Sequence, residues 1–131
     1  MSYFVLDTHV MVSGFLSSDS AAGMILNELV NMSFALILDS RIYLEYRDVL
    51  ERPRFRLSPS LVEPVLALVK AKGMWISPQR YNGPLISEGD RPFVEAALSA
   101  GVPVISRSEV FTSAAGPLTV LSPEKFLSCE V

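Results

Sequence analysis

Cysteine and histidine are nearly absent from this sequence, which holds one of each, Cys129 and His9, among its 131 residues. A single cysteine cannot form a disulfide bond within the chain, which is typical of proteins in a reducing compartment. The chain also lacks the cluster of cysteine and histidine residues that soft-ligand metal sites require. A metal site in this chain is therefore expected to use oxygen ligands.

An excess of positive charge and a long apolar run are missing as well. The formal net charge is -3, so the chain has no overall basic footprint for nucleic acid, although a local basic patch is compatible with this charge. No apolar run approaches the length of a membrane-spanning helix. The N-terminus carries neither the basic segment nor the apolar segment of a signal peptide, so we expect a cytoplasmic protein with no membrane partner.

Hydrophobic residues are abundant: they make up 50% of the chain, whereas charged residues make up 19%. These proportions indicate a compact globular protein rather than a disordered one. A length of 131 residues suits one domain with a substantial core. Because the chain shows no internal repeat, linker or low-complexity tract, we expect a single domain over residues 1–131.

Short apolar runs alternate with segments of helical periodicity along the chain. Strands are predicted near residues 3–6, 34–38, 74–77, 102–106 and 118–121. Helices are predicted over residues 20–31 and 41–51, from residue 58 or 60 to 72, over 90–100, and briefly from 123, with a turn or short helical start at 10–16. Strands joined by helical crossovers predict an α/β fold, a three-layer α/β/α sandwich around a mainly parallel five-stranded sheet. Pro64 fits this scheme at little cost only in the first turn of its helix.

The first predicted strand ends directly in Asp7 and Thr8. A fully apolar run of this kind indicates a buried strand of a parallel sheet, and sites in open α/β sheets form outside the carboxyl ends of the strands. A charge at the end of a buried strand is costly unless it caps a helix, pairs with another charge or binds a cation. Asp7 is therefore the first candidate site residue.

Glu45 lies inside the apolar stripe of its predicted helix, three residues after Ile42 and next to Tyr46. A carboxylate on a buried face needs a partner. Arg41, one helical turn back, is one candidate partner. The interpretation we favour is a metal ion shared with Asp7, because a simple surface salt bridge would more naturally lie on the opposite face of the helix.

Asp90 stands at the start of the helix predicted over residues 90–100. Aspartate is a favoured N-cap residue, so the position alone indicates no more than a helix start. The crevice of a doubly wound sheet can nevertheless gather such a group beside the first strand. Three carboxylates without a histidine or cysteine cluster would favour Mg²⁺ or Mn²⁺, and such a site is typical of phosphodiester hydrolysis.

Five segments in order resemble the PIN-domain ribonucleases, of the kind found as the toxin component of toxin–antitoxin pairs. The segments are residues 5–10 (opening Asp-Thr motif), 40–55 (helix with the second acid, then an Arg-Pro-x-Phe turn), 89–97 (third acid), 104–108 and 122–127 (Ser-Pro-x-x-Phe-Leu). Each segment alone is a weak signal. Together, at family-like spacing, they cover nearly the whole chain.

The resemblance implies an endoribonuclease that hydrolyses RNA phosphodiester bonds with Mg²⁺ or Mn²⁺. It implies that Asp7, Glu45 and Asp90 are the catalytic residues and the metal ligands, and that the Thr8 hydroxyl supports the site. A small antitoxin protein and a homodimer are the partners that it implies besides the RNA substrate.

Two departures from the family pattern concern the site itself. His9 replaces the usual asparagine beside Asp7, and we interpret it as a polar substitute that supports the site. The position of the fourth acid falls on Ser108, with Glu109 next to it. A serine can hold a water molecule of the site but supplies no charge, and Glu109 could reach in instead.

These departures leave two alternatives open. One is a catalytically weakened PIN domain that acts as an RNA- or protein-binding module, which Ser108 favours. The other is a phosphatase that forms a phosphoaspartate, because such enzymes also begin with an aspartate after a strand. They commonly carry a second acid two residues on, where this chain has His9, so this alternative is disfavoured.

Several other side chains could have a functional role, but the sequence also allows a purely structural interpretation of each. Asp39 follows a strand as Asp7 does, but we expect a helix cap because a helix start follows directly. We expect Trp75, Tyr43 and Tyr46 in the core. Cys129, near the chain end, has no base beside it in the sequence.

A local group of arginines stands out in this acidic chain: Arg52, Arg54 and Arg56. Contact with RNA is one interpretation, and a solvated loop is the commoner meaning of such a group. Arg107, close to the predicted site, is the better candidate for a contact with an RNA phosphate.

Overall fold

The computed structural model of the protein describes residues 1–84, 87–108, 111 and 118–129. Its sheet has five strands in the order β3-β2-β1-β4-β5, and every pairing is parallel. The strands are β1 (Tyr3–Leu6), β2 (Ala35–Leu38), β3 (Met74–Trp75), β4 (Val104–Ile105) and β5 (Val120–Leu121). The predicted α/β fold with its five-stranded sheet is therefore confirmed.

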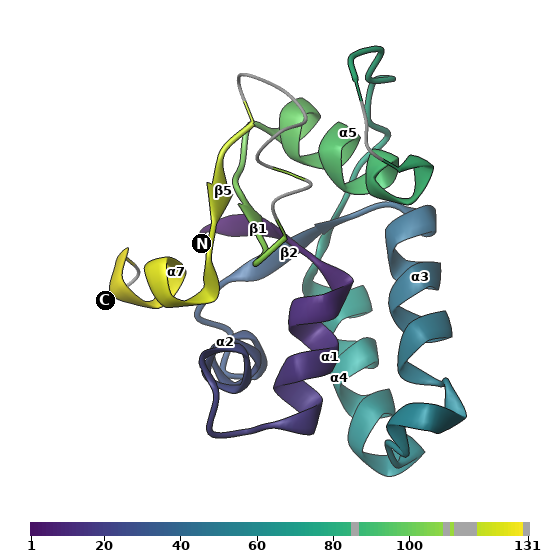
Figure 1. Cartoon of the computed structure of the whole chain (residues 1–131), viewed down its shortest axis with the longest axis vertical. Coiled ribbons are helices and arrows are strands. Elements are labelled where there is room, and N and C mark those ends of the chain that lie inside the picture. The colour runs from purple at the N-terminus through teal and green to yellow at the C-terminus, as the bar shows by residue number, and fades with distance from the viewer. Residues whose placement is uncertain (85–86, 109–110, 112–117, 130–131) are drawn as a thin grey trace.

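Helices lie on both sides of this sheet, with α5 on one side and α1, α2 and α4 on the other (Figure 1). The described helices are α1 (Thr8–Leu16), α2 (Ala21–Val30), α3 (Ser40–Leu50), α4 (Pro59–Lys72), α5 (Arg91–Ala100) and α7 (Pro123–Cys129), with the 3-10 turns η1 (Pro53–Phe55) and η2 (Glu88–Asp90). Among the described residues no helix combines the length and the apolar character that crossing a membrane requires.

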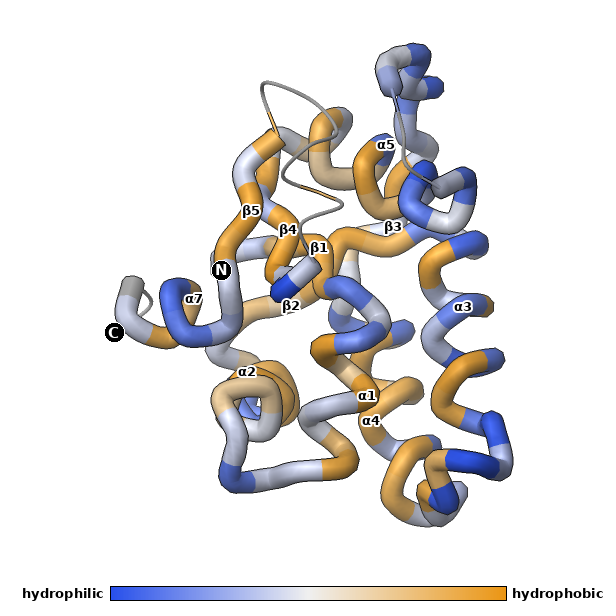
Figure 2. The backbone as a smooth tube through the Cα atoms, viewed as in Figure 1, coloured by the Kyte–Doolittle hydropathy of each residue, from blue (hydrophilic) through white to orange (hydrophobic). Residues whose placement is uncertain are grey.

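The central strands are hydrophobic along their length, and hydrophilic residues gather on the helices and loops around them (Figure 2). Strand β2 is buried at every residue, as expected for the interior of a parallel sheet covered on both faces. Phe4, Phe34 and Phe126 pack edge to face with ring centroids 4.9–5.7 Å apart, so α7 closes the core over β1.

Helix α1 is longer than the turn or short helical start predicted for residues 10–16, because it runs from Thr8 to Leu16. Asp7 is its N-cap residue and accepts a hydrogen bond from the backbone N–H of His9. Gly14 does not break the helix because it faces α2, where a Cβ atom would lie 2.8 Å from the carbonyl oxygen of Ala22. The glycine thus permits the close approach of two helices rather than ending one of them.

Pro64 lies past the first turn of α4, which begins at Pro59, so the condition for a proline of little cost is not met. A proline there removes the hydrogen bond to the carbonyl of Ser60. Both residues are exposed, so water can satisfy that carbonyl. The other end of the helix is as predicted, with Gly73 at the C-cap.

The expectation that Trp75 is a core residue is wrong, whereas Tyr43 and Tyr46 are buried as predicted. Trp75 is 44% exposed because β3 is a two-residue edge strand whose side chains both face solvent. Its indole N–H donates to the backbone carbonyl of Lys70, and its ring packs at a tilt against Tyr43.

Candidate active site

Asp7 lies at the carboxyl end of β1 and is only 5% exposed. Its Oδ1 atom accepts from the backbone N–H of His9 at 3.2 Å and lies 3.3 Å from Nδ1 of the same histidine. Its Oδ2 atom accepts a hydrogen bond of 2.6 Å from the hydroxyl of Ser106. Both carboxylate oxygens are thus oriented by the chain, and their remaining lone pairs are available to a cation.

Glu45, on α3, meets the same strand end through Thr8. The Thr8 hydroxyl donates to Oε2 of Glu45 at 2.5 Å, and the Tyr46 hydroxyl donates to the carbonyl of Leu6 at 2.6 Å. Burial raises the pKa of Tyr46 well above its ordinary value, and the negative charges of Asp7 and Glu45 raise it further. The two carboxylates therefore share one neighbourhood, although Glu45 is only half-buried.

The alternative partner of Glu45, Arg41, lies elsewhere. Its guanidinium group binds Asp39 at 2.6 Å and Glu95 at 2.8 Å. The sequence reading of an ion pair between Arg41 and Glu45 is therefore wrong.

Asp90 ends η2 and takes the N-cap position of α5, but its side chain makes no capping hydrogen bond. Within the described part of the chain, its Oδ2 atom is buried and has no hydrogen-bond partner. Burial raises the pKa of the Asp90 carboxyl. A backbone hydrogen bond from Ser87 acts against this shift, and the negative charge of Asp7 adds to it, so the net shift is upward. The helix-cap interpretation of Asp90 thus fails, and a buried carboxylate oxygen beside a second acid is left without a donor.

The three acids come from β1, α3 and the start of α5, which the topology brings to the carboxyl edge of the sheet. Among residues 1–84, 87–108, 111 and 118–129, no group of three or more histidine, cysteine, aspartate or glutamate side chains lies close enough to hold a metal ion as it stands. The donor chemistry nevertheless fits a hard divalent cation: every candidate ligand is a carboxylate oxygen, and the buried Oδ2 of Asp90 has no donor among the described residues, so a cation would compensate it.

Ser106 is a further candidate site residue, which the sequence reasoning missed. It is 2% exposed and comes directly after β4, which pairs with β1 so that Leu6 lies beside Ile105. Its hydroxyl donates to Asp7 and accepts from the backbone N–H of Ser108 at 2.9 Å. The signal in the sequence is a small polar residue after a buried strand, and it becomes useful only once β4 is placed next to β1.

Replacing Ser106 by alanine is expected to weaken binding of Mn²⁺ by about 10–100-fold, because groups that orient a metal ligand contribute about this much to affinity. The stability of the fold should fall by about 1–2 kcal/mol, since Asp7 loses a donor and Ser108 an acceptor in a buried place. Calorimetric titration with Mn²⁺ measures the first effect and urea denaturation the second. Ser106→Thr keeps the hydroxyl and serves as the control; equal Mn²⁺ affinity of Ser106→Ala and wild type would contradict the role.

The remaining predicted site residues lie around these acids. The His9 side chain is 92% exposed and reaches back to Asp7. Ser108 is half-buried, two residues beyond Ser106. Arg107 is paired with Glu124, and this ion pair lowers the pKa of the Glu124 carboxyl. Glu109 lies outside the described residues.

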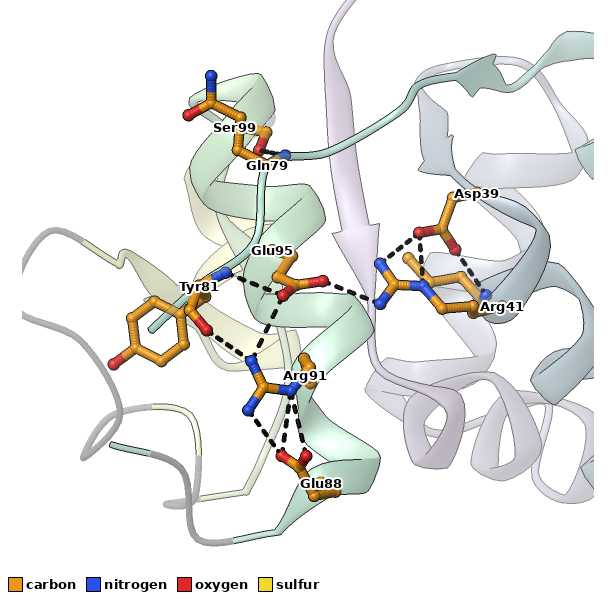
Figure 3. Close-up of polar contacts among 9 residues, drawn as sticks. Asp39, Arg41, Gln79, Tyr81, Glu88, Arg91, Glu95 and Ser99 are labelled. Atoms are coloured by element: carbon orange, nitrogen blue, oxygen red, sulfur yellow. Dashed lines mark hydrogen bonds and ion pairs between the residues drawn. The ribbon is translucent and has the colours of Figure 1, made fainter. Parts of the chain in front are cut away.

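A second charged cluster lies beside the candidate site, at the end of β2 and along α5 (Figure 3). Asp39 caps α3 as predicted, accepting from the backbone N–H of Ile42 at 2.9 Å. Arg41 bridges Asp39 to Glu95, and Arg91 joins Glu95 to the exposed Glu88. Every charge in this cluster has an opposite partner, and the pair of Arg41 with Glu95 links α3 to α5 next to the site.

Glu95→Gln is expected to lower the free energy of unfolding by about 2 kcal/mol at pH 7, because Glu95 is buried and accepts charged hydrogen bonds. Burial raises the pKa of Glu95, but the backbone N–H of Tyr81 and the guanidinium of Arg41 lower it more, so the net shift is downward. A carboxyl with a lowered pKa stabilises the fold above its ordinary value of 4.5 and loses this effect as the pH falls through the lowered pKa.

The difference between Glu95→Gln and wild type should therefore shrink in acid, as urea denaturation at neutral and acidic pH will show. Glu88→Gln is the matched control, because Glu88 binds the same Arg91 but is 76% exposed. Surface ion pairs of that kind contribute little, so this variant should unfold close to wild type. Equal midpoints for Glu95→Gln and wild type at pH 7 would contradict the prediction.

The fold and the site together define a class: an α/β domain with a 3-2-1-4-5 parallel sheet and acidic side chains gathered at the carboxyl ends of its strands. The family model described as PIN domain matches residues 3–106, and the chain belongs to this family. The PIN domain family is a family of nucleases, and its members typically depend on a metal ion, Mg²⁺ in most cases. The matched range spans the positions of Asp7, Glu45, Asp90 and Ser106. A sequence comparison with curated proteins gives no match.

Proposed function

We propose that the protein is a Mg²⁺- or Mn²⁺-dependent endoribonuclease that hydrolyses RNA phosphodiester bonds. The observation that carries the proposal is the buried Oδ2 atom of Asp90, which has no donor among the described residues. The negative charge of Asp7 also raises the pKa of the Asp90 carboxyl. A protein keeps such an oxygen at a cost unless a cation compensates it. Membership of a nuclease family gives that cation a chemical purpose.

In this proposal Asp7, Glu45 and Asp90 hold the cation. When bound, the ion would activate water and stabilise the charge that develops on the phosphate and the leaving oxygen. The hydroxyl of Ser106 orients Asp7, and that of Thr8 orients Glu45, so the carboxylates are positioned before the substrate arrives. In this proposal Arg107 contacts a substrate phosphate once its ion pair with Glu124 opens.

The biological role that we propose is that of the toxin of a type II toxin–antitoxin pair, neutralised by a small antitoxin protein, with a homodimer as the assembly. The support for this role is the resemblance of five ordered sequence segments. Co-expression with the product of a small neighbouring gene, followed by isolation of a stable complex, would test it.

The experiment for the activity is cleavage of a mixed-sequence RNA by the purified protein with Mn²⁺, with Mg²⁺ and with excess chelator. Cleavage that requires the metal supports the proposal. A folded protein that neither cleaves RNA nor binds Mn²⁺ by calorimetry would contradict it.

A second candidate is a PIN domain that binds RNA or a protein but cleaves poorly. The observation that favours it is Ser108, which stands where the resemblance places a fourth acid. Metal binding together with RNA binding, but without cleavage, would select this candidate.

A further inference from the structure

Two open pockets lie on either side of His9, at the first turn of α1. The larger has a volume of about 480 Å³ and includes Thr8 and Glu45 in its wall. The smaller has a volume of about 290 Å³ and includes Asp7 and Arg107. Both pockets are lined by His9 and Ser13, so they adjoin each other at the candidate active site.

The larger pocket combines an apolar wall with two cationic side chains. Its apolar members are Val12, Leu16, Val49 and Phe55. Leu16 is 53% exposed, so its side chain offers apolar surface to an occupant of the pocket. The cationic side chains belong to two arginines that also line the pocket, Arg52 and Arg54.

These two arginines make only weak interactions with the rest of the chain. Arg54 lies over the ring of Phe55 at 4.8 Å, and within the described residues it has no carboxylate at ion-pairing distance. Arg52 pairs with the exposed Asp48 one turn earlier on the helix, a type of pair that contributes little. Both guanidinium groups can therefore bind an anion at small cost.

The third arginine of this group, Arg56, is placed differently. It is exposed, takes a left-handed backbone conformation with φ of 52°, and does not line the pocket. The structure thus divides a group of arginines that the sequence presented as one. Arg52 and Arg54 face the site, and Arg56 does not.

We infer that the larger pocket is a subsite for one unpaired nucleotide of the RNA strand, next to the phosphate that is cleaved. The base packs on Leu16, Val49 and Phe55, and Arg52 and Arg54 bind its phosphate. The strand then crosses His9 into the smaller pocket at Arg107. The inference rests on the proposed function, because it takes Glu45 and Asp7, which line the two pockets, as part of the site of cleavage.

The chemistry of the pocket suits this occupant. A volume of about 480 Å³ lies within the range of about 300–1,000 Å³ that is usual for small-ligand sites. Arginine binds phosphate through paired, geometrically matched hydrogen bonds. A base can reach an apolar wall only when it is unstacked and unpaired, so the pocket favours single-stranded over double-stranded RNA.

The test measures binding of a fluorescein-labelled single-stranded RNA of about 12 nucleotides, long enough to span both pockets. Fluorescence anisotropy is recorded with chelator and with Ca²⁺, at several salt concentrations, for wild type, Arg52→Gln, Arg54→Gln and Arg56→Gln. Each of the first two substitutions should weaken binding at least about fivefold, because each removes a charged contact to a phosphate. Each should also reduce the slope of log Kd against log salt by about 0.7, the value for one phosphate contact on a single strand.

Arg56→Gln is the matched control and should change neither quantity, and a duplex of the same sequence should compete poorly. Equal binding and equal salt slopes for all four proteins, or equal losses for all three variants, would overturn the subsite. So would a wild-type protein that binds no RNA in either condition.

The assay separates this inference from the proposed function. If wild type cleaves RNA with Mn²⁺ but Arg52→Gln and Arg54→Gln bind normally, the subsite is wrong and the nuclease stands. If binding depends on the two arginines but no cleavage occurs, the proposed binding of RNA in the larger pocket is supported and the proposed hydrolase activity is wrong.

Discussion

Asp7→Asn should abolish nearly all RNA cleavage, with a fall of about a thousandfold in kcat/KM, equivalent to about 4 kcal/mol of transition-state stabilisation. Asparagine lacks the negative charge that the proposed cation requires. It remains a good helix N-cap, so the hydrogen bond from His9 that begins α1 should persist. A single-turnover cleavage assay with Mn²⁺ measures the loss, and thermal unfolding checks that the fold is intact.

Asp39→Asn provides a matched control inside the same chain. Asp39, like Asp7, follows a buried strand, caps the next helix and is less than a tenth exposed. Its charge is neutralised by Arg41, whereas Asp7 has no arginine or lysine partner among the described residues. We expect Asp39→Asn to reduce stability while cleavage continues. Comparable losses of cleavage in both variants would show that Asp7 acts through the fold rather than through chemistry.

Asp90→Asn should distinguish most clearly between a metal ligand and a structural residue, because its expected effects on thermal stability without metal and with Mn²⁺ have opposite signs. Without metal, the variant should unfold at a higher temperature than wild type, since it removes the charge of a carboxyl that lies near Asp7 and whose buried Oδ2 atom has no donor among the described residues. With Mn²⁺, wild type should gain stability, by about 2.7 kcal/mol when the ion is at a hundred times its Kd, and the variant should gain much less. Cleavage should fall by a factor similar to that for Asp7→Asn.

Differential scanning fluorimetry with chelator and with a series of Mn²⁺ concentrations measures both effects without reference to activity. Glu88→Gln, an exposed neighbour on the same 3-10 turn, should keep the Mn²⁺ response of wild type. A metal-free Asp90→Asn protein clearly less stable than wild type would show that Asp90 is a structural group, and the proposed metal site would lose its main support.

Local sequence patterns were sufficient for the architecture. The apolar runs that became β1 and β2 are buried on both faces, and such runs predict interior strands of a parallel sheet. Ser20, Ser58 and Gly73 end or begin helices where the sequence suggested. These features depend on residues a few positions apart, so a linear reading captures them. The full extent of the helix over Thr8–Leu16 was not predicted. Gly14 is accommodated there because the neighbouring helix α2 packs closely against it, which the local sequence does not show.

The hydrogen-bond and ion-pair partners of the acidic residues, in contrast, were decided by the tertiary structure. The sequence itself determined that acids stand after strands and at helix starts, and it named Asp7, Glu45 and Asp90. It could not tell a helix cap from an uncompensated acid at Asp90, or an ion pair with Arg41 from a hydrogen bond with Thr8 at Glu45. These outcomes depend on groups 37, 54 and 99 residues apart in the chain, in the contacts of Thr8 with Glu45, Arg41 with Glu95, and Ser106 with Asp7. Hydrophobic periodicity is a local property, whereas the compensation of a buried charge depends on which elements the crossovers of the sheet bring together.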